Sequence, residues 1–220
     1  MRCACPVPVP VPVPVRPVLP RPRTVALLAL GAGVALLPVA RTWGLQWGAT
    51  EDELDATLVG DDQVRDAGLI ATRAVTIDAP ADRVWPWLVQ LGQGRGGFYS
   101  YDWLENLLGL EIHSAARLEN RWQDLAVGDE VRLACAAPLV VSVLEAPTAL
   151  VLCAPDASFT WAFTLHPGRD RTTRLVVRER WARPRRWAVP VQEAVGLAST
   201  VMSRAMLLGI KERVERRARS

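Results

Sequence analysis

The sequence predicts an α+β domain in which an antiparallel sheet is covered on one face by a long C-terminal helix. Between residues 130 and 181, apolar side chains recur with a period of two, which is typical of β-strands. Residues 191–217 have the helical period instead. The strands follow one another in the chain rather than alternating with helices, and this grouping favours an α+β architecture over a parallel sheet.

A first strand is expected over residues 71–78, where apolar and polar positions alternate. Asp78 and Pro80 then mark the start of a helix, because Asp can cap a helix and Pro is tolerated in its first turn. This helix ends at Gly92. A second helix is expected over residues 101–108.

Short strands follow the second helix. They are expected over residues 130–135, 139–145, 150–153, 159–165 and 172–181. The C-terminal helix has an apolar stripe that we expect to face the sheet, formed by Val191, Val195, Ala198, Met202, Ala205 and Gly209. A sheet wrapped on one long helix leaves a gap between the two, and such gaps are natural sites for apolar ligands.

Composition narrows the possible functions. Half of the residues are hydrophobic and 22% are charged, as in a globular protein, and the net charge of +3 is too small to indicate a nucleic-acid partner. No Cys/His spacing indicates zinc, and no metal or cofactor is expected. Cys135 and Cys153 are interpreted as buried apolar residues, with a disulfide as the alternative if the domain is exported.

The chain begins with a Pro-rich tail over residues 1–23. Pro alternates with Val between residues 6 and 15, which blocks a helix and predicts an extended, disordered, polyproline-like segment. We interpret it as low-complexity sequence, with a ligand for a proline-recognition domain as the alternative.

Residues 24–42 are expected to form a hydrophobic helix that anchors the chain in a membrane. Thr24 to Ala40 carry no charge, and Trp43 follows where an aromatic belt would lie. A signal peptide and a buried core helix are the alternatives. Arginines are more frequent before this segment than after it, so the positive-inside rule places the domain outside the cytoplasm. Residues 43–70 are polar and acidic, and we expect a linker there.

Several motifs resemble one family. They are TRAVTIDAP from Thr72, VWPWLVQ from Val84, GQGRGGFYSYDW from Gly92, WGAT from Trp47 and MLLGIKER from Met206. The chain resembles the START/polyketide-cyclase (SRPBCC) superfamily over residues 43–217, and in particular its poorly characterised bacterial membrane-associated branch. The resemblance implies the helix-grip fold for residues 71–217. It implies no reaction, because that superfamily includes lipid carriers, receptors and cyclases.

Gly92, Gly94 and Gly97 match G-x-G-x-x-G. A dinucleotide fingerprint follows a strand and begins a helix, whereas these glycines follow a predicted helix. We therefore expect a tight turn between two helices here.

Polar and aromatic residues are densest between Tyr99 and His113. Tyr99, Tyr101, Trp103, Glu105 and His113 are candidates for ligand binding, and Asp102 shares a helix face with Glu105. These residues have two interpretations. They carry out acid/base chemistry, or they cap a helix and bind backbone groups.

Glu179 lies on the apolar side of its strand, whereas Arg174, Arg178 and Arg180 lie on the other side. A carboxylate on a buried face is costly unless it is paired. Glu179 is therefore a polar anchor or proton acceptor for a ligand, or it pairs with an arginine. Trp161, Phe163, Val177 and Met202 are expected to line the same cavity or the core.

The sequence thus favours a membrane-tethered module that binds a lipid-like or other apolar small molecule between the sheet and the C-terminal helix. One alternative is an enzyme of the cyclase or dehydratase type. The other is a structural or interaction protein whose cavity is collapsed.

Overall fold

A computed structural model describes residues 35–107, 109–134 and 137–219. Backbone contacts divide the chain into two compact units, residues 1–38 and 39–220. In the first unit only residues 35–38 are described, and they belong to a helix that continues to residue 45. The predicted Pro-rich tail (1–23) and most of the predicted anchor (24–42) lie outside the described residues.

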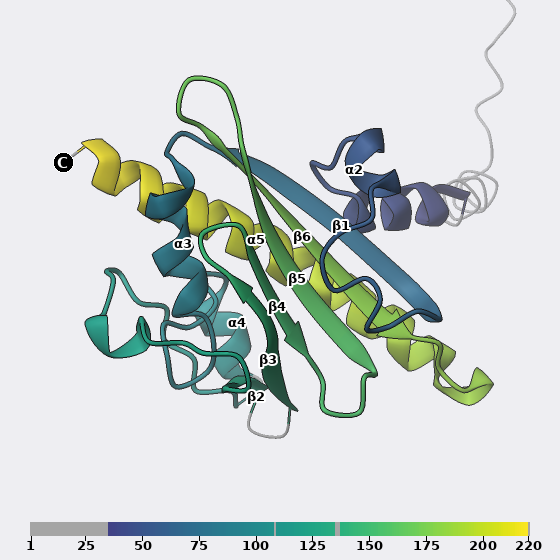
Figure 1. The fold of residues 1–220 in the computed structure, drawn as a ribbon. Helices are drawn as coiled ribbons and strands as arrows, with labels where there is room; N and C mark the ends of the chain where they lie inside the picture. The colour runs from purple at the N-terminus through teal and green to yellow at the C-terminus, as the bar shows by residue number, and fades with distance from the viewer. Residues whose placement is uncertain (1–34, 108, 135–136, 220) are drawn as a thin grey trace, which may run out of the picture. The chain divides into compact units, whose positions relative to one another are not determined.

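The second unit contains one six-stranded antiparallel sheet (Figure 1). Its strands are β1 (Ala67–Ile77), β2 (Glu130–Ala134), β3 (Ala137–Glu145), β4 (Ala149–Cys153), β5 (Phe159–Pro167) and β6 (Thr173–Ala182). They lie in the order β1-β6-β5-β4-β3-β2, so the first strand joins the hairpin formed by the last two. The strands agree with the predicted ones to within a few residues.

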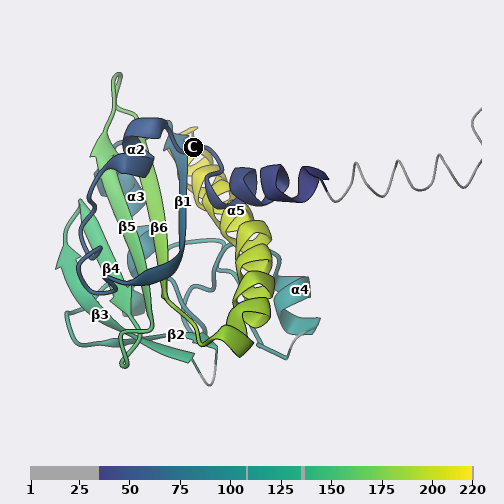
Figure 2. The same ribbon diagram turned by 90° about the vertical axis from the view of Figure 1, so that its right-hand side faces the viewer.

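Helices complete the unit. They are α2 (Glu51–Asp55), α3 (Ala81–Val89), α4 (Asp102–Leu107) and α5 (Val189–Arg219), with single 3-10 turns η1 (Asn120–Trp122) and η2 (Arg186–Ala188). α5 runs along one face of the sheet, which we call the inner face (Figure 2). Met206, Leu207 and Ile210 of α5 are buried in the main core beside inner-face residues such as Phe163 and Leu175. The sheet and its long helix confirm the predicted α+β, helix-grip fold.

Residues 43–66 were expected to belong to a linker, and this expectation is wrong, because the segment packs on the sheet. The Ala74 amide of β1 donates to the Trp47 carbonyl at 3.1 Å, and Leu45 and Val64 are buried. β1 itself begins at Ala67, before the expected start at residue 71.

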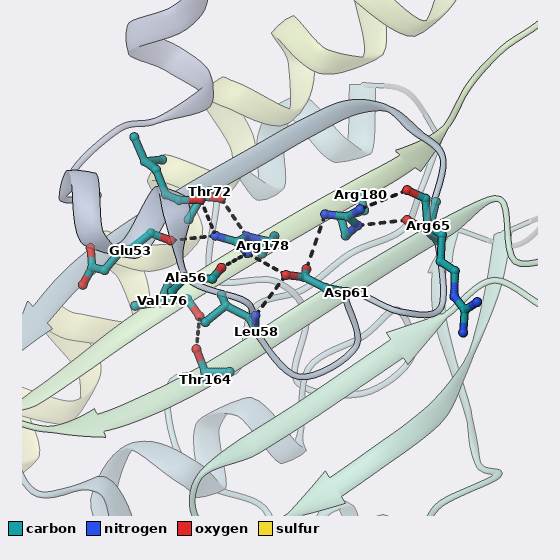
Figure 3. Close-up of polar contacts among 12 residues, drawn as sticks. Glu53, Ala56, Leu58, Asp61, Arg65, Thr72, Thr164, Val176, Arg178 and Arg180 are labelled. Atoms are coloured by element: carbon teal, nitrogen blue, oxygen red, sulfur yellow. Dashed lines mark hydrogen bonds and ion pairs between the residues drawn. The ribbon is translucent and has the colours of Figure 1, made fainter.

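Three arginines on the outer face of β6, Arg174, Arg178 and Arg180, bind this segment, and Figure 3 shows the contacts of Arg178 and Arg180. The Arg178 guanidinium is buried and donates to Thr72 Oγ1, to the backbone carbonyls of Glu53 and Ala56, and to Asp61 at 2.7 Å. Arg180 lies 3.6 Å from Asp61, and Arg174 binds Glu53 at 2.7 Å. Two of the acidic residues of this segment, Glu53 and Asp61, therefore neutralise arginines of the sheet.

The two halves of α5 differ in which side chains face the sheet. In the second half the buried residues are large and apolar, as in Leu207 and Val214. In the first half the predicted stripe is wrong, because Val191, Val195 and Ala198 are exposed and Ser203 is buried instead. Among the described residues, one helical segment, Arg186–Arg217, is long and apolar enough to cross a membrane, a property that it shares with core helices of globular domains.

Candidate functional site

The residues between Tyr99 and His113 do not share one environment. Tyr99 is buried, its hydroxyl donates to the Trp87 carbonyl at 3.1 Å, and burial raises the pKa of this phenol well above its ordinary value. Tyr101, Trp103 and His113 are exposed. The structure therefore gives these residues no common pocket for acid/base chemistry.

Asp102 and Glu105 have separate structural tasks. Asp102 accepts hydrogen bonds from both the amide and the hydroxyl of Ser114, at 2.7 and 2.5 Å, and so fixes the segment that follows α4. Glu105 is buried and accepts a hydrogen bond from Ser100. Burial raises the pKa of Glu105, and its second carboxylate oxygen has no hydrogen-bond partner among the described residues.

The glycine motif forms the tight turn that its context predicted. Gly92 and Gly97 pair as an isolated β-bridge, and the Gly92 amide donates to the Gly97 carbonyl at 3.1 Å. Gln90, just before the turn, is fully buried and accepts from the Glu119 amide at 3.1 Å. This loop organises the connection between α3 and α4 and has no phosphate-binding geometry, since it does not begin a long helix.

Glu179 pairs with Arg73, its neighbour on β1. The Arg73 guanidinium lies 3.0 Å from the Glu179 carboxylate, and both side chains are almost fully buried on the inner face. Ser203 Oγ donates to one carboxylate oxygen at 2.6 Å, and Ser199 Oγ donates to the other. With both oxygens bonded within the protein, Glu179 fastens the first half of α5 to the sheet.

Arg73 adds two contacts that extend this pair. Its guanidinium donates to Thr200 Oγ1 at 3.1 Å and to the Gly44 carbonyl at 2.9 Å. We call Arg73, Glu179, Ser199, Thr200 and Ser203 the inner polar cluster. Of the two sequence interpretations of Glu179, the ion pair is therefore the one found, with an arginine that sequence reasoning had not singled out.

A pocket of about 390 Å³ lies at the end of the sheet where β6 leaves it. It is lined by Leu133, Ala137, Pro138, Leu139, Ala154, Pro155, Asp156, Ser158, Phe159 and Trp181. Phe159 and Trp181 lie side by side on neighbouring strands, with ring centroids 4.1 Å apart. One acidic side chain, Asp156, is present in an otherwise mainly apolar wall.

Two buried indole N–H groups on the inner face have no acceptor in the described part of the chain, and one of them belongs to Trp181, which lines this pocket. The indole nitrogens of Trp161 and Trp181 are buried and have no hydrogen-bond partner among the described residues. Both residues lie on the inner face, because Phe159 pairs with Trp181 and Trp161 pairs with Glu179 across the β5–β6 ladder. A buried donor without an acceptor is costly, so a ligand that supplied one would recover that cost.

The remaining candidates form the walls of the core. Phe163 and Val177 are fully buried, Trp161 packs between Phe98 and Phe163 at centroid distances of 6.1 and 4.8 Å, and Met202 is half-buried. Sequence reasoning missed Trp181, although its strand period places it on the same face as Trp161. It predicted the strands of the β2–β3 hairpin but did not place their side chains at a pocket, because they carry no recognisable motif.

Two further pockets lie at the other end of α5. Their volumes are about 400 and 360 Å³, and Trp87, Leu118 and Arg217 line both. The larger pocket is also lined by Arg117, Arg213 and Arg216, and the smaller one by Arg83. Arg213 donates to the Ala115 carbonyl and stacks on the ring of Tyr99, and Arg216 pairs with Glu212.

Among the described residues, no three metal-ligating side chains lie close enough together to hold a metal ion. Cys153 is a half-buried free thiol, and Cys135 lies outside the described residues.

No protein-family model matches this chain, and no curated protein matches it in sequence. Solved structures with a similar fold include a Polyketide_cyc-like protein from Corynebacterium glutamicum, with 14% identity, a TM-score of 0.43 and coverage of 66% of this chain and 91% of that one. An AHSA1-like protein from Aeromonas hydrophila has 15% identity, a TM-score of 0.38 and coverage of 68% and 95%. A protein from Nitrosospira multiformis has 16% identity, a TM-score of 0.42 and coverage of 69% and 100%.

The name of the first neighbour contains the polyketide-cyclase designation. At this level of similarity the likeness concerns the fold alone, and it carries no activity or ligand to this chain. The membrane-associated branch stays a prediction.

Proposed function

We propose that this protein is a membrane-tethered module that binds an apolar small molecule carrying a hydrogen-bond acceptor. The pocket between the β2–β3 hairpin, Phe159 and Trp181 is the binding site in this proposal. The observation that carries it is the buried indole N–H of Trp181, which lines this pocket and has no acceptor among the described residues.

Volume and polarity support this class of ligand. A pocket of about 390 Å³ is in the range of small-molecule sites, which combine apolar walls with few polar groups that set orientation. A carbonyl, ether or ester oxygen would satisfy an indole donor while the rest of the ligand contacts Leu133, Leu139 and Phe159. Such a molecule is lipid-like in chemistry.

The enzyme alternative has little geometric support. Glu179 has both carboxylate oxygens bonded inside the inner polar cluster, Tyr99 donates to a backbone carbonyl, and His113 is exposed. General acid/base catalysis requires groups that converge on one reacting atom, and these three lie in different surroundings.

Membrane tethering rests on the uncharged segment from Thr24 to Ala40. In the described part of the helix that follows from it, Leu36, Leu37 and Val39 are exposed apolar residues. Fractionation of cells that express the full chain tests this part. The tether is wrong if the protein is recovered without detergent.

The ligand part is tested with two probes that differ by one acceptor, 2-acetylnaphthalene and 2-ethylnaphthalene. Native mass spectrometry of the full chain released from lipid nanodiscs counts the bound molecules. We expect the ketone to bind and Trp181→Phe to weaken it by about fivefold, the value of a hydrogen bond of about 1 kcal/mol. The affinity for 2-ethylnaphthalene should be the same in Trp181→Phe as in the unaltered chain.

Trp103→Phe is the matched control, because Trp103 is exposed and lies outside the pocket. The proposal is wrong if neither probe binds, which would favour the structural alternative with a collapsed cavity. It is also wrong in its use of the indole if Trp181→Phe weakens both probes equally.

A further inference from the structure

In the first half of α5, polar side chains face the sheet and apolar side chains are exposed, the reverse of an ordinary amphipathic helix. The residues that this half contributes to the inner polar cluster are hydroxylic, namely Ser199, Thr200 and Ser203. The large exposed side chains here are apolar: Trp187 in η2, and Val189, Val191, Val195, Leu197 and Val201 in α5. Trp187 is 75% exposed and Leu197 is 59% exposed. We call these six residues the outer apolar face.

Water is a poor environment for this face. Between Trp187 and Ser203 the only charged residue is Glu193, and Arg41 neutralises it with two hydrogen bonds of 2.6 and 2.8 Å. A helix that faces water normally carries its charges outward, and a large contiguous apolar surface marks an interaction site. The polar side of this helix is instead used inside the domain.

The chain enters the second unit beside this helix. Arg41, which pairs with Glu193, is the first charged residue after the uncharged segment that ends at Ala40. Ala40 and Arg41 share a small pocket with Gly196, Leu197 and Thr200 of α5. Ala40 and Arg41, at the start of the second unit, are therefore in contact with the helix that carries the outer apolar face.

The residues that border the face have the composition of a membrane interface. Arg185 and Arg186 are exposed and directly precede Trp187, and Arg204 is exposed at the other end. Tryptophan and arginine beside an apolar helix face favour the level of lipid headgroups, where the ring is half-buried and the cation meets phosphate. A second copy of the chain would bring the same arginines together, which disfavours a symmetric protein contact.

We infer that the outer apolar face lies against the lipid surface of the membrane that the anchor enters. This inference rests on the tether in the proposed function and adds a second, peripheral membrane contact. It also connects the membrane to the binding pocket, because Trp181 of the pocket is followed in the chain by Arg183, Arg185 and Arg186 and then by the face itself. A lipid-like ligand would enter from the bilayer at this edge.

Site-specific photo-crosslinking tests the contact. The full chain carries p-benzoylphenylalanine in place of Leu197, in nanodiscs of phosphatidylcholine and phosphatidylglycerol, and adducts are identified by mass spectrometry. The control carries it in place of Val127, an exposed apolar residue in the turn before β2. We expect lipid adducts at position 197 and no lipid adducts at position 127.

The outcomes separate this inference from the proposed function. If the chain remains in the bilayer but position 197 gives no lipid adduct, or gives a crosslink to a second copy, the lipid-contact inference is overturned and the tether stands. If the chain does not partition into the bilayer at all, the tether itself fails. A Leu197→Gln variant with unchanged thermal unfolding should also lose lipid protection from hydrogen exchange in residues 191–201. Unchanged exchange would count against the contact.

Discussion

The first half of α5 turns hydroxyl groups toward the sheet, whereas the second half turns large apolar side chains toward it. Opposite the first half, the inner face carries the buried Arg73–Glu179 pair. Opposite the second half, it carries core residues such as Leu175. The comparison teaches that the partner surface, and not the helix itself, decides which residues are buried.

The physical reason lies in the cost of burying charge. A buried ion pair is stable only when its remaining donors and acceptors are also bonded. Ser199 and Ser203 supply those bonds to Glu179, and Thr200 supplies one to Arg73. The exposed positions of the first half of α5 are occupied by apolar residues.

The largest effect is expected where the first half is fastened. Arg73→Met leaves the Glu179 carboxylate buried and without its cation, and should cost about 3–5 kcal/mol in the free energy of unfolding. Denaturant unfolding of the full chain in detergent measures it. The double variant Arg73→Met, Glu179→Leu should regain a large part of that loss.

The matched control is Arg41→Met, which breaks the half-exposed pair with Glu193 on the same half of the helix. It should cost less than about 1 kcal/mol. Equal losses for Arg73→Met and Arg41→Met would show that the inner polar cluster has no special role.

Leucine truncation compares the halves directly. Leu207 is fully buried, so Leu207→Ala should cost about 3 kcal/mol through lost burial and the cavity it leaves. Leu197 points outward, so Leu197→Ala should change the free energy of unfolding by less than about 0.5 kcal/mol. Chemical denaturation in one detergent gives both values, and similar costs would contradict the assigned orientation of the first half.

Each half also contains a helical glycine. A Cβ at Gly209 would lie 2.0 Å from the Tyr99 carbonyl oxygen, which is backbone and cannot move aside. Gly209→Ala should therefore destabilise by about 2 kcal/mol. At Gly196 the nearest atom is a Leu69 methyl at 3.0 Å, and Gly196→Ala should be close to neutral because alanine favours the helix. Thermal unfolding ranks the two variants. A lower melting temperature for Gly196→Ala than for Gly209→Ala would contradict this prediction.

The smallest effect concerns the pH dependence of the Arg41–Glu193 pair. The hydrogen bonds from Arg41 lower the pKa of Glu193 in the folded protein. A lowered carboxyl pKa stabilises the fold above the ordinary value of 4.5, and this contribution is lost as the pH falls below that value. Glu193→Gln should lose less than about 1 kcal/mol at neutral pH, because the pair is half-exposed.

The check for this variant is a pH series of unfolding experiments. The difference between Glu193→Gln and the unaltered chain should shrink as the pH falls from neutral through the carboxyl range. A difference that grows in acid would contradict the assigned sign.

Strand periodicity predicted much of this fold from the sequence. The alternation along β5 and β6 placed Trp161, Phe163 and Glu179 on one face and Arg178 on the other, as observed. The same alternation along β1 puts Arg73 on the inner face with Val75, so the partner of Glu179 was contained in the pattern.

Other features could not be read from the sequence. The stripe of α5 was misassigned because apolar residues were taken to face the sheet. In the first half of α5 hydroxyl groups face the sheet instead, because the Arg73–Glu179 pair lies opposite them. The segment around Glu53 and Asp61 has the composition of a solvated linker, and its partners on β6 are more than a hundred residues away. The pocket depends on the indole orientation of Trp181, which no period determines.

The reversed helix has a practical consequence for handling the protein. Deleting the hydrophobic segment 24–40 would still leave Trp187, Val191, Leu197 and Val201 exposed on the domain. A shortened chain of that kind should self-associate in plain buffer and become monodisperse when a mild detergent covers α5. Removing an anchor usually converts a tethered protein into a soluble one, and here the domain would keep its own adhesive surface.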